Sequence, residues 1–478
     1  MAFGQKGRFA FYQRRRVKLN YMIFATVSVA LMLSSISATS IAVAFPMITA
    51  YFGVPLMIAG WIISVYQLGF TVTMPIIGKV SDVFSRKSTF IVCLVLFIVS
   101  SAMCALAKNI EMLIFFRLLQ AFGGGGFMPS AVGIISEVFP ESRQKMIGLF
   151  SSIFPIGQII GPNVGGWLVD SFGWRSVFLI NIPIGLFALI LSVFLLPAGE
   201  RKRGSIDFLG AGLLGMSLAM LMLGLTFLGY GSAAKWAWPS FVASVVLAFL
   251  LLRHENKVSD PILDLDILKR KPFVAANFYN LIYGGAVVGV LSLIPMFATA
   301  NYGMTPSECG LLLTPRSVGM IIASVLTSIY IMKWGYRWPL IIGNTATVVG
   351  LYFLGLEPAS VLFLYLIMFL LGVGVGVLSP TANNACIELL PDRAATITGI
   401  RGMFRQMGGA LSVTIATLVV ETVGDPSRGF AIVFFGLAIA FIAAMPLIFM
   451  MPSRPGAGVE RSGHALRRQE ATAKERVQ

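Results

Sequence analysis

The segment PSAVGIISEVFPESRQKMIGLFSSIFPIG at residues 129–157 occurs again, in related form, as PTANNACIELLPDRAATITGIRGMFRQMG at residues 380–408. Eight positions agree at one offset of 251 residues, without a gap. The matched pairs are Pro129/Pro380, Ser130/Thr381, Ala131/Ala382, Glu137/Glu388, Pro140/Pro391, Glu141/Asp392, Gly148/Gly399 and Gly157/Gly408. Two apolar segments joined by a short acidic turn are therefore duplicated within the chain.

The duplication extends to glycines outside this segment. The further pairs are Gly123/Gly374 and Gly125/Gly376 at an offset of 251, and Gly60/Gly310 and Gly69/Gly319 at an offset of 250. The sequence therefore predicts two related halves. In membrane proteins, repeated halves usually place a binding site at their interface.

The composition is that of an integral membrane protein. Of 478 residues, 57% are hydrophobic and 12% are charged, and the mean hydropathy is +0.86. A helix needs ~20 apolar residues to cross ~30 Å of hydrocarbon. The sequence predicts an all-α protein with fourteen spans, at residues 21–46, 56–78, 88–107, 111–137, 144–169, 176–196, 207–230, 237–253, 274–300, 307–332, 338–355, 358–386, 394–421 and 428–451.

The net charge of +16 is explained by membrane topology. With the N-terminus in the cytoplasm, 28 of the 36 Lys/Arg residues fall in cytoplasmic loops and tails, four fall in outer loops and four lie within spans. This bias follows the positive-inside rule and predicts a multi-pass plasma-membrane protein with both termini in the cytoplasm. Nucleic acid is not needed to explain the basic excess, and the basic residues at 1–20 are suited to membrane lipid.

The sequence predicts neither a metal site nor a cofactor. The two histidines lie outside the spans, and the four cysteines lack CxxC spacing: Cys93, Cys104, Cys309 and Cys386. An enzyme would need a nucleophile with a base or a metal cluster, and an ATP-driven pump would need a phosphate-binding Gly-Lys-Ser/Thr loop. We therefore expect neither an enzyme nor an ATP-driven pump.

Three segments of the first half combine glycine with polar residues. The loop GKVSDVFSRK, residues 78–87, joins a turn glycine to charged groups. The segment RLLQAFGGGG, residues 117–126, places Arg117 and Gln120 on one helix face, although a charge within a span is costly. The segment GQIIGPNVGG, residues 157–166, forms a ridge without side chains, which lets another helix pack closely.

These three segments resemble, in order, the signature motifs of the major facilitator superfamily, and the last resembles its antiporter motif. The number of expected spans resembles the fourteen-span drug:proton antiporter branch. The resemblance covers residues 20–452. It implies a secondary transporter of the multidrug-efflux and drug-resistance type, which exports small amphipathic molecules by alternating access and is coupled to protons.

The resemblance also implies two six-helix halves separated by two additional helices, the major facilitator fold in a 6+2+6 arrangement. The duplication agrees, because spans 4–5 and spans 12–13 are eight apart. The chain is expected to act as a monomer. Its expected parts are a basic cytoplasmic tail at 1–20, a six-helix half at 21–196, two inserted helices at 207–253, a cytoplasmic linker at 254–273, a second six-helix half at 274–451 and a disordered cytoplasmic tail at 452–478.

The same resemblance assigns gating roles in the first half. The cytoplasmic loop is expected to hold the transporter closed through Gly78, Asp82, Arg86 and Lys87. The glycine ridge is expected to pack closely and limit leak through Gly157, Gly161, Pro162, Gly165 and Gly166. The sequence departs from the family at Ser85, where a glycine is usual.

The distribution of charge within the spans predicts which substrates fit. All 20 Asp/Glu residues lie in loops, tails or terminal turns, whereas Arg117, Arg316 and Arg405 lie well inside. A cationic drug would meet this positive charge without a counter-ion, whereas an anionic or zwitterionic amphiphile would supply one. Residues expected to bind substrate or couple transport are Ser37, Arg117, Gln120, Asn280, Arg316, Asn344, Arg405 and Gln406.

Other interpretations remain open. Ser37 replaces the aspartate usual in span 1, and a hydroxyl does not titrate in the range needed to carry a proton. A non-proton-coupled exporter or uniporter of an anionic or zwitterionic metabolite is one alternative, and Glu137 or Glu388 could instead carry a proton. A transport-deficient binding or sensor protein is another. The buried arginines could also bond helix carbonyls or amide side chains without meeting substrate.

Overall fold

The computed structural model describes residues 2–142, 146–147, 149–150, 153–197, 207–229, 231, 233–258, 271–387 and 394–453. All regular elements within these ranges are helices, which confirms the all-α fold. The helices group into two compact units. The first unit contains Met1–Gly215 with Thr305–Gly310, and the second contains Met216–Met304 with Leu311–Gln478.

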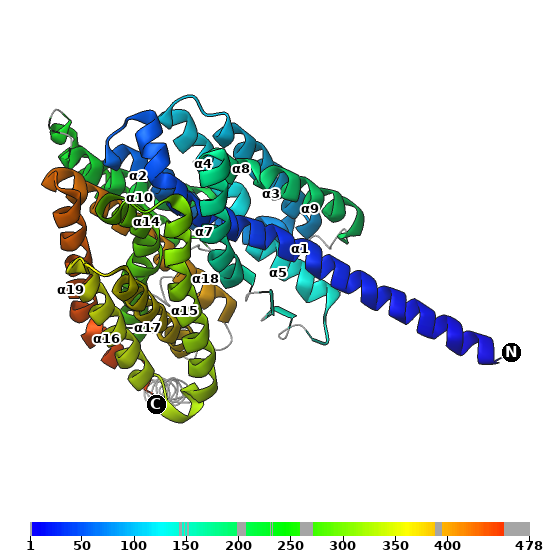
Figure 1. Ribbon diagram of the computed structural model, residues 1–478. Coiled ribbons are helices and arrows are strands. Elements are labelled where there is room, and N and C mark those ends of the chain that lie inside the picture. Colours follow the sequence, from blue (N-terminus) through cyan, green and yellow to red (C-terminus); the bar gives the residue numbers. More distant parts are fainter. Residues whose placement is uncertain are drawn as a thin grey trace. The chain divides into compact units, whose positions relative to one another are not determined.

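The first unit is built around the long helix α1, which packs along α7 and also contacts α5 and α9 (Figure 1). Helices α2 and α3 both pack on α4. The bounds are α1 Ala2–Phe52, α2 Leu56–Val83, α3 Arg86–Ala105, α4 Ile110–Gly125, α5 Phe127–Val138, α7 Ile153–Phe172, α8 Ser176–Leu179 and α9 Asn181–Leu195.

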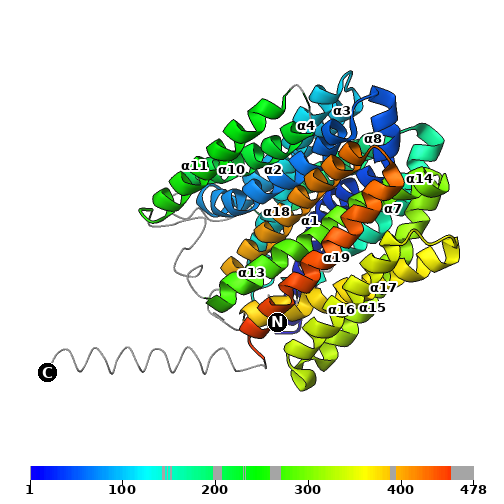
Figure 2. The same ribbon diagram turned by 90° about the vertical axis from the view of Figure 1, so that its left-hand side faces the viewer.

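The second unit brings α13, α18 and α19 together, and α16 packs between α17 and α19 (Figure 2). Helix α10, Phe208–Leu228, passes from the first unit into the second. The remaining bounds are a 3-10 turn at Ala234–Trp236, α11 Ala237–Glu255, α13 Lys271–Gly284, the π-helical segment η2 Gly285–Val290, α14 Leu291–Tyr302, α15 Pro306–Trp334, α16 Arg337–Gly355, α17 Val361–Ile387, α18 Ala394–Val423 and α19 Pro426–Met450.

Glycines at duplicated positions end equivalent helices of the two units. Gly53 follows α1 with a φ of 60°, and Gly303, 250 residues later, follows α14 with a φ of 63°. Gly173 and Gly424, 251 residues apart, follow α7 and α18 with φ values of 78° and 75°. A side chain is disfavoured in this left-handed region, so glycine ends a helix there at least cost.

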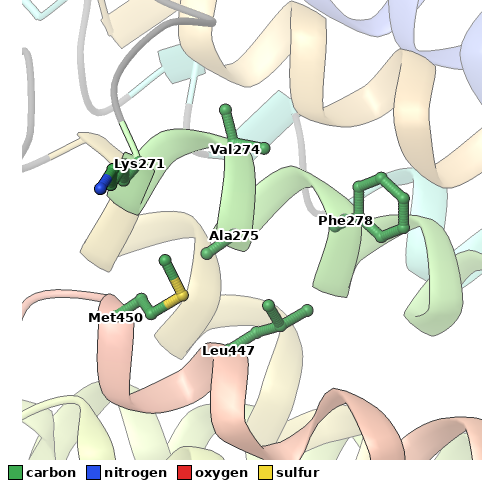
Figure 3. A pocket seen from close by; sticks show the side chains of 6 residues that line it. All are labelled: Lys271, Val274, Ala275, Phe278, Leu447 and Met450. Carbon is green, nitrogen blue, oxygen red and sulfur yellow. The ribbon is translucent and has the colours of Figure 1, made fainter.

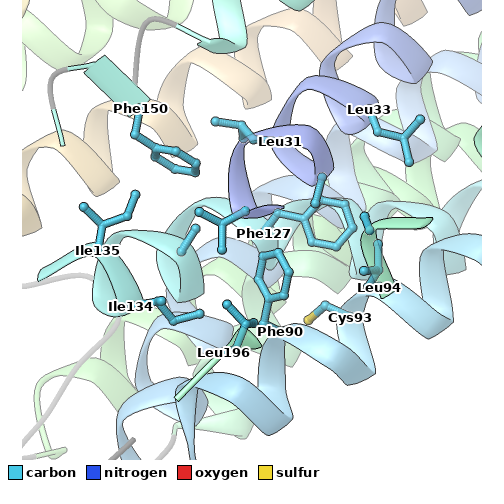
Figure 4. Packing of buried hydrophobic residues seen from close by; sticks show 14 of the residues in the cluster. Leu31, Leu33, Phe90, Cys93, Leu94, Phe127, Ile134, Ile135, Phe150 and Leu196 are labelled. Carbon is cyan, nitrogen blue, oxygen red and sulfur yellow. The ribbon is translucent and has the colours of Figure 1, made fainter. Parts of the chain in front are cut away.

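The hydrophobic core of the first unit lies where α1, α3 and α5 meet (Figure 4). The ring of Phe127, at the start of α5, lies 5.7 Å from that of Phe90 and 5.4 Å from that of Phe97, both on α3. All three side chains are buried. This packing fixes α3 and α5 against each other.

The structure has twelve helices long and apolar enough to cross a membrane, or up to thirteen if one bent pair, Lys271–Gly289 with Ser292–Tyr302, counts as a span. These numbers apply to the described residues alone. The expected fifth span, residues 144–169, overlaps residues outside them, and α7 occupies its second part. The multi-span helical architecture is therefore confirmed, whereas the number fourteen is not.

Three elements differ in detail from the expected spans. Helix α1 begins at Ala2, so the basic segment continues the first span as helix. The fourth span divides at Gly126 into α4 and α5. The ninth contains a π-helical segment at Gly285–Val290, a form that often marks a functional site.

Candidate functional site

A buried polar network in the first unit is centred on Arg117 and Gln120 of α4. Arg117 Nη1 donates to Gln120 Oε1 at 2.6 Å, and Arg117 Nε donates to the carbonyl oxygen of Ile62 on α2 at 3.2 Å. The guanidinium also lies over the Tyr66 ring, 4.1 Å from its centroid. Arg117 is 1% exposed. Neutral groups therefore satisfy this cation within its own unit, by hydrogen bonds and by a cation–π contact.

The network reaches Ser37 of α1 through Gln120. Gln120 Nε2 donates to Ser101 Oγ of α3 at 2.7 Å and to Ser37 Oγ at 3.4 Å. Asn181 Nδ2 of α9 donates to Ser37 Oγ at 3.1 Å. The structure thus brings together three predicted residues, Ser37, Arg117 and Gln120. It adds Ser101 and Asn181, which sequence reasoning missed.

The glycine ridge of α7 packs against the hydroxyl-bearing face of α1. A Cβ atom added at Gly157 would lie 2.6 Å from Ser35 Cβ, and one added at Gly165 would lie 2.6 Å from Ser40 Cβ. Gly161 faces Ile36 and Thr39 in the same way. Ser35 Oγ donates to the carbonyl oxygen of Phe154 on α7 at 2.6 Å.

The other side of the α7 ridge faces the segment Thr305–Gly310, which belongs to the first unit. A Cβ atom at Gly166 would lie 2.9 Å from Ser307 Cα, and one at Gly310 would lie 3.0 Å from the carbonyl carbon of Pro162. Backbone therefore meets backbone on this side. The ridge residues named from the sequence are all helix-contact residues.

The second unit contains a cluster of three arginines around Tyr283 of α13. Arg401 and Arg405 of α18 and Arg316 of α15 lie against the turns that flank this tyrosine, at Asn280, Gly284 and Val287 respectively. Tyr283, Arg316 and Arg401 are buried, whereas Arg405 is partly exposed. Of these, Arg401 and Tyr283 were not singled out as site residues from the sequence, although Arg401 precedes Arg405 by one helical turn.

The partners of the three guanidinium groups differ. Arg316 Nη2 donates to the carbonyl oxygen of Val287 in the π-helical segment at 3.0 Å. Arg401 donates to Cys386 Sγ at 3.0 Å and to Asn280 Oδ1 at 3.3 Å, and Asn280 Nδ2 donates back to the Arg401 carbonyl oxygen. Arg405 forms neither a hydrogen bond nor an ion pair with any residue that the structure describes.

Asn344 and Gln406 are both buried, and Asn344 hydrogen-bonds partners other than the three arginines. Asn344 Oδ1 accepts from the Tyr279 hydroxyl at 2.9 Å, and Asn344 Nδ2 donates to the Phe441 carbonyl oxygen at 3.3 Å, which joins α13, α16 and α19. Gln406 is 7% exposed. Of the predicted residues in the second unit, Asn280, Arg316 and Arg405 therefore reach the arginine cluster or its direct partners, and Asn344 forms a separate pair.

The predicted gating loop forms contacts within the first unit. Arg86 Nη1 of α3 lies 2.5 Å from Glu137 Oε1 of α5 and donates to the Gly133 carbonyl oxygen at 2.8 Å. Lys87 Nζ donates to the Val193 carbonyl oxygen at 2.7 Å. Gly78 lies near the end of α2, where an added Cβ would be 3.7 Å from Pro129 Cβ. The Asp82 side chain and the whole of Glu388 lie outside the described residues.

Ser85, the departure from the usual glycine, is accommodated without strain. Its φ of 178° is extended backbone, and its hydroxyl accepts from the Ser88 amide as the N-cap of α3. Any residue adopts this conformation, so the loop does not need a glycine here. Gly335, 250 residues later, has a φ of 71°. The duplicated positions Ser85 and Gly335 therefore differ in backbone conformation, one extended and the other left-handed.

The two units repeat the same contacts between equivalent helices. A Cβ atom at Gly69 of α2 would meet Leu118 Cδ1 of α4 at 3.0 Å, and one at Gly319 of α15 would meet Phe369 Cδ2 of α17 at 3.3 Å. Leu118 and Phe369 are themselves 251 residues apart. The close packing of one duplicated helix pair is therefore conserved within each unit.

A second pair of equivalent contacts joins the duplicated segments to the first helix of each unit. A Cβ atom at Gly157 would lie 3.1 Å from the Met32 carbonyl oxygen of α1, and one at Gly408 would lie 3.0 Å from Leu281 Cα of α13. At the position equivalent to Gly161, α18 carries Ser412, whose Cβ would lie 3.3 Å from a Cβ atom added at Gly285. The glycine at this contact lies on α7 in the first unit, as Gly161, but in the π-helical segment opposite α18 in the second unit, as Gly285. The close approach of the two helices is retained.

An apolar groove lies on the second unit between α13 and α19, away from these polar groups (Figure 3). Its lining residues are Lys271, Val274, Ala275, Phe278, Leu447 and Met450. None of the predicted site residues lines it. No group of three or more potential metal ligands occurs among the residues that the structure describes.

A polytopic helical protein built from two internally repeated units is the architecture of secondary transporters. The family model of the major facilitator superfamily matches residues 27–276 and 276–475. The chain therefore belongs to the major facilitator superfamily.

Relatives of this chain are named as drug and antibiotic exporters. It is 30% identical to the multidrug transporter protein MdtP of Bacillus subtilis over 84% of this chain and 75% of that protein. It is also 30% identical to the tetracenomycin C resistance and export protein of Streptomyces glaucescens, over 84% of this chain and 76% of that protein.

The fold matches solved transporter structures. A crystal structure of a bacterial homologue of the human lysosomal transporter Spinster superposes with a TM-score of 0.65 at 16% identity, covering 90% of this chain and 96% of that one. This similarity supports the fold alone. The family and the fold together point to a membrane transporter rather than an enzyme.

Proposed function

We propose that this protein exports small amphipathic molecules across the plasma membrane by alternating access. The observation that carries the proposal is the similarity, over 84% of the chain, to a multidrug transporter. The repeated contacts within the two units support it, because duplicated helix bundles that pack alike can expose one site to either side of the membrane in turn. We further propose the 6+2+6 arrangement of fourteen spans, a monomer, and cytoplasmic termini.

The coupling ion of this transport is a separate part of the proposal. Family resemblance favours protons, yet the groups bonded around Ser37 are Gln120 and Asn181, which do not titrate. Among the described carboxylates of the first unit, Glu137 is ion-paired with Arg86 between two helices. We therefore propose Glu137 as the proton-binding group of this unit, since protonation would release Arg86 and loosen α3 from α5.

Glu137→Gln is expected to remove proton-driven accumulation of a transported dye while leaving dye exchange at no less than about half its rate. The amide retains a hydrogen bond to Arg86 but has neither the charge nor a proton to exchange. The measurement compares pH-gradient-driven uptake with dye exchange in the same proteoliposomes. Glu111→Gln, at the start of α4, is the matched control. Equal loss of both activities would mean that the pair is structural.

Reconstituted transport tests the proposed function itself. Proteoliposomes with an acidic lumen are given rhodamine B or its ethyl ester, and lumenal dye is measured with and without an ionophore that collapses the pH gradient. We expect accumulation that the ionophore abolishes. Dye entry that follows the dye gradient alone, with or without the ionophore, would favour the uncoupled exporter. Dye that binds the protein without entering the lumen would favour a binding or sensor protein.

A further inference from the structure

The arginine cluster of the second unit concentrates positive charge inside a helix bundle. Arg316 comes from α15, and Arg401 and Arg405 come from successive turns of α18. They lie against successive turns of α13 and the π-helical segment, at Val287 for Arg316, Asn280 for Arg401 and Gly284 for Arg405. The described acidic residues of this unit are Glu255, Glu357, Glu421 and Asp425, and none of them is ion-paired with the cluster.

Two of the three cations are occupied by protein groups. Arg316 holds the Val287 carbonyl oxygen at 3.0 Å, and Arg401 holds Asn280 and Cys386. These partners are neutral, so they satisfy hydrogen-bonding groups without cancelling the charge. A buried cation without a counter-ion is unfavourable by several kcal/mol. The cluster therefore favours an anion.

Arg405 is the member able to accept that anion. Its guanidinium bonds no residue in the described part of the chain, and its side chain is partly exposed. Its backbone is fixed, because α13 crosses it at Gly284, where an added Cβ would lie 2.8 Å from Arg405 Cα. A planar guanidinium on a fixed backbone can bind a carboxylate with two parallel hydrogen bonds.

Tyr283 adds a hydroxyl beside this guanidinium. Its hydroxyl lies 3.4 Å from the Val375 carbonyl oxygen and also hydrogen-bonds the Ser379 side chain. Both of these partners are neutral, so the hydroxyl can turn to donate to a carboxylate, which is the stronger acceptor. Guanidinium and phenol together offer donors to both oxygens of a carboxylate.

Arg117 of the first unit does not offer an equivalent site. Arg117 is 1% exposed and is enclosed by Gln120, Ile62 and the Tyr66 ring. An anion could reach it only by displacing these contacts. The two intramembrane arginine sites are therefore chemically different, and charge recognition falls to the second unit.

We propose that Arg405 and Tyr283 bind the carboxylate of the transported molecule, with Arg316 and Arg401 supplying a positive field. This inference rests on the proposed function, and it names the substrate class as amphipathic carboxylates, including zwitterions. Lipophilic cations without an acid group are poor substrates.

Rhodamine B and its ethyl ester test this directly, because the two dyes differ at the carboxylate alone. Binding to the purified full chain in nanodiscs is measured by fluorescence anisotropy. We expect the wild-type protein to bind the acid at least tenfold more tightly than the ester. Arg405→Gln should reduce this ratio to about one by weakening acid binding, and Arg405→Lys should give an intermediate ratio because it keeps the charge without the planar fork.

Arg428→Gln is the matched control, because it removes one positive charge from the same unit at a side chain that is 82% exposed. It should leave the ratio unchanged. A wild-type ratio of one or less would overturn the proposal, as would an unchanged ratio in Arg405→Gln. If one of these overturning ratios is found but either dye is transported, the proposed export function stands and carboxylate recognition is rejected. If the protein strongly prefers the acid but transports neither dye, export is contradicted and carboxylate recognition stands.

A third variant tests the Tyr283 hydroxyl itself. Tyr283→Phe removes the hydroxyl and keeps the ring, so it should reduce acid binding about threefold to tenfold with no effect on the ester. A uniform loss for both dyes, in all three variants at Arg405 and Tyr283, would show a structural role and reject carboxylate recognition.

Discussion

Alanine in place of Gly157 or Gly408 is expected to destabilise the protein by similar amounts, about 1–3 kcal/mol each, through overpacking. The added Cβ would lie 2.6 Å from Ser35 Cβ in the first variant and 3.0 Å from Leu281 Cα in the second. Neither helix can move aside without disturbing its own unit. The two glycines are 251 residues apart, so duplicated positions should respond alike.

The measurement is thermal unfolding in detergent followed with a thiol-reactive fluorogenic dye, since all four cysteines are buried. Gly212→Ala in α10 and Gly436→Ala in α19 are matched controls, because an added Cβ at either position meets nothing within 4 Å. Alanine should be neutral or stabilising there, as it favours helix over glycine by up to about 1 kcal/mol. Equal effects at all four positions would contradict the packing described for the duplicated segments.

Arg117→Met is expected to destabilise the first unit by roughly 2–4 kcal/mol, because removal of the guanidinium leaves the buried Gln120 Oε1 without its donor and also removes the bond to the Ile62 carbonyl oxygen. Methionine retains much of the volume, so the loss reports the hydrogen bonds more than a cavity. The same thermal unfolding assay measures it.

A double-mutant cycle with Gln120→Leu separates the network from the individual side chains. The two residues bond directly at 2.6 Å, so we expect a coupling energy of about 1 kcal/mol or more. Lys108→Met, at an exposed position, should change stability by less than about 0.5 kcal/mol. Strict additivity of Arg117→Met and Gln120→Leu would show that the network does not act as a unit.

The duplicated pattern allowed much of the helical architecture to be predicted. Gly69 and Gly319 were matched by offset, and each lies at a close helix contact with an equivalent neighbour. Long apolar runs are sufficient to place helices, because hydrocarbon requires every backbone group to be bonded internally. Helix irregularities were less accessible. The division at Gly126 and the π-helical turn at Gly285–Val290 depend on tertiary packing.

The polar partners of the site were harder to predict. Ser101 and Asn181 join Ser37 and Gln120 from helices that lie up to 144 residues away along the chain. Serine and asparagine within spans are usually bonded to their own helix, so a single sequence gives no reason to select these two. Arg401 carried a signal, because it lies one turn before Arg405, yet its bonds to Asn280 and Cys386 needed coordinates.

The two arginine sites suggest a division of work between the units. Arg117 is enclosed by neutral groups and stabilises helix packing. Arg405 is partly exposed beside Tyr283 and is suited to meet an anion. In this account, the first unit supplies a firmly packed bundle that contains the Arg86–Glu137 pair, and the second supplies charge recognition.

Counterflow in proteoliposomes tests the central claim, that this duplicated bundle transports a small amphipathic molecule, most directly. Vesicles are preloaded with unlabelled rhodamine B and diluted into a trace of isotopically labelled dye, with no pH gradient. The account predicts that label accumulates transiently above its external concentration, because an alternating site returns with label after releasing unlabelled dye. Label that equilibrates without overshoot, in vesicles whose protein binds the dye, would contradict it.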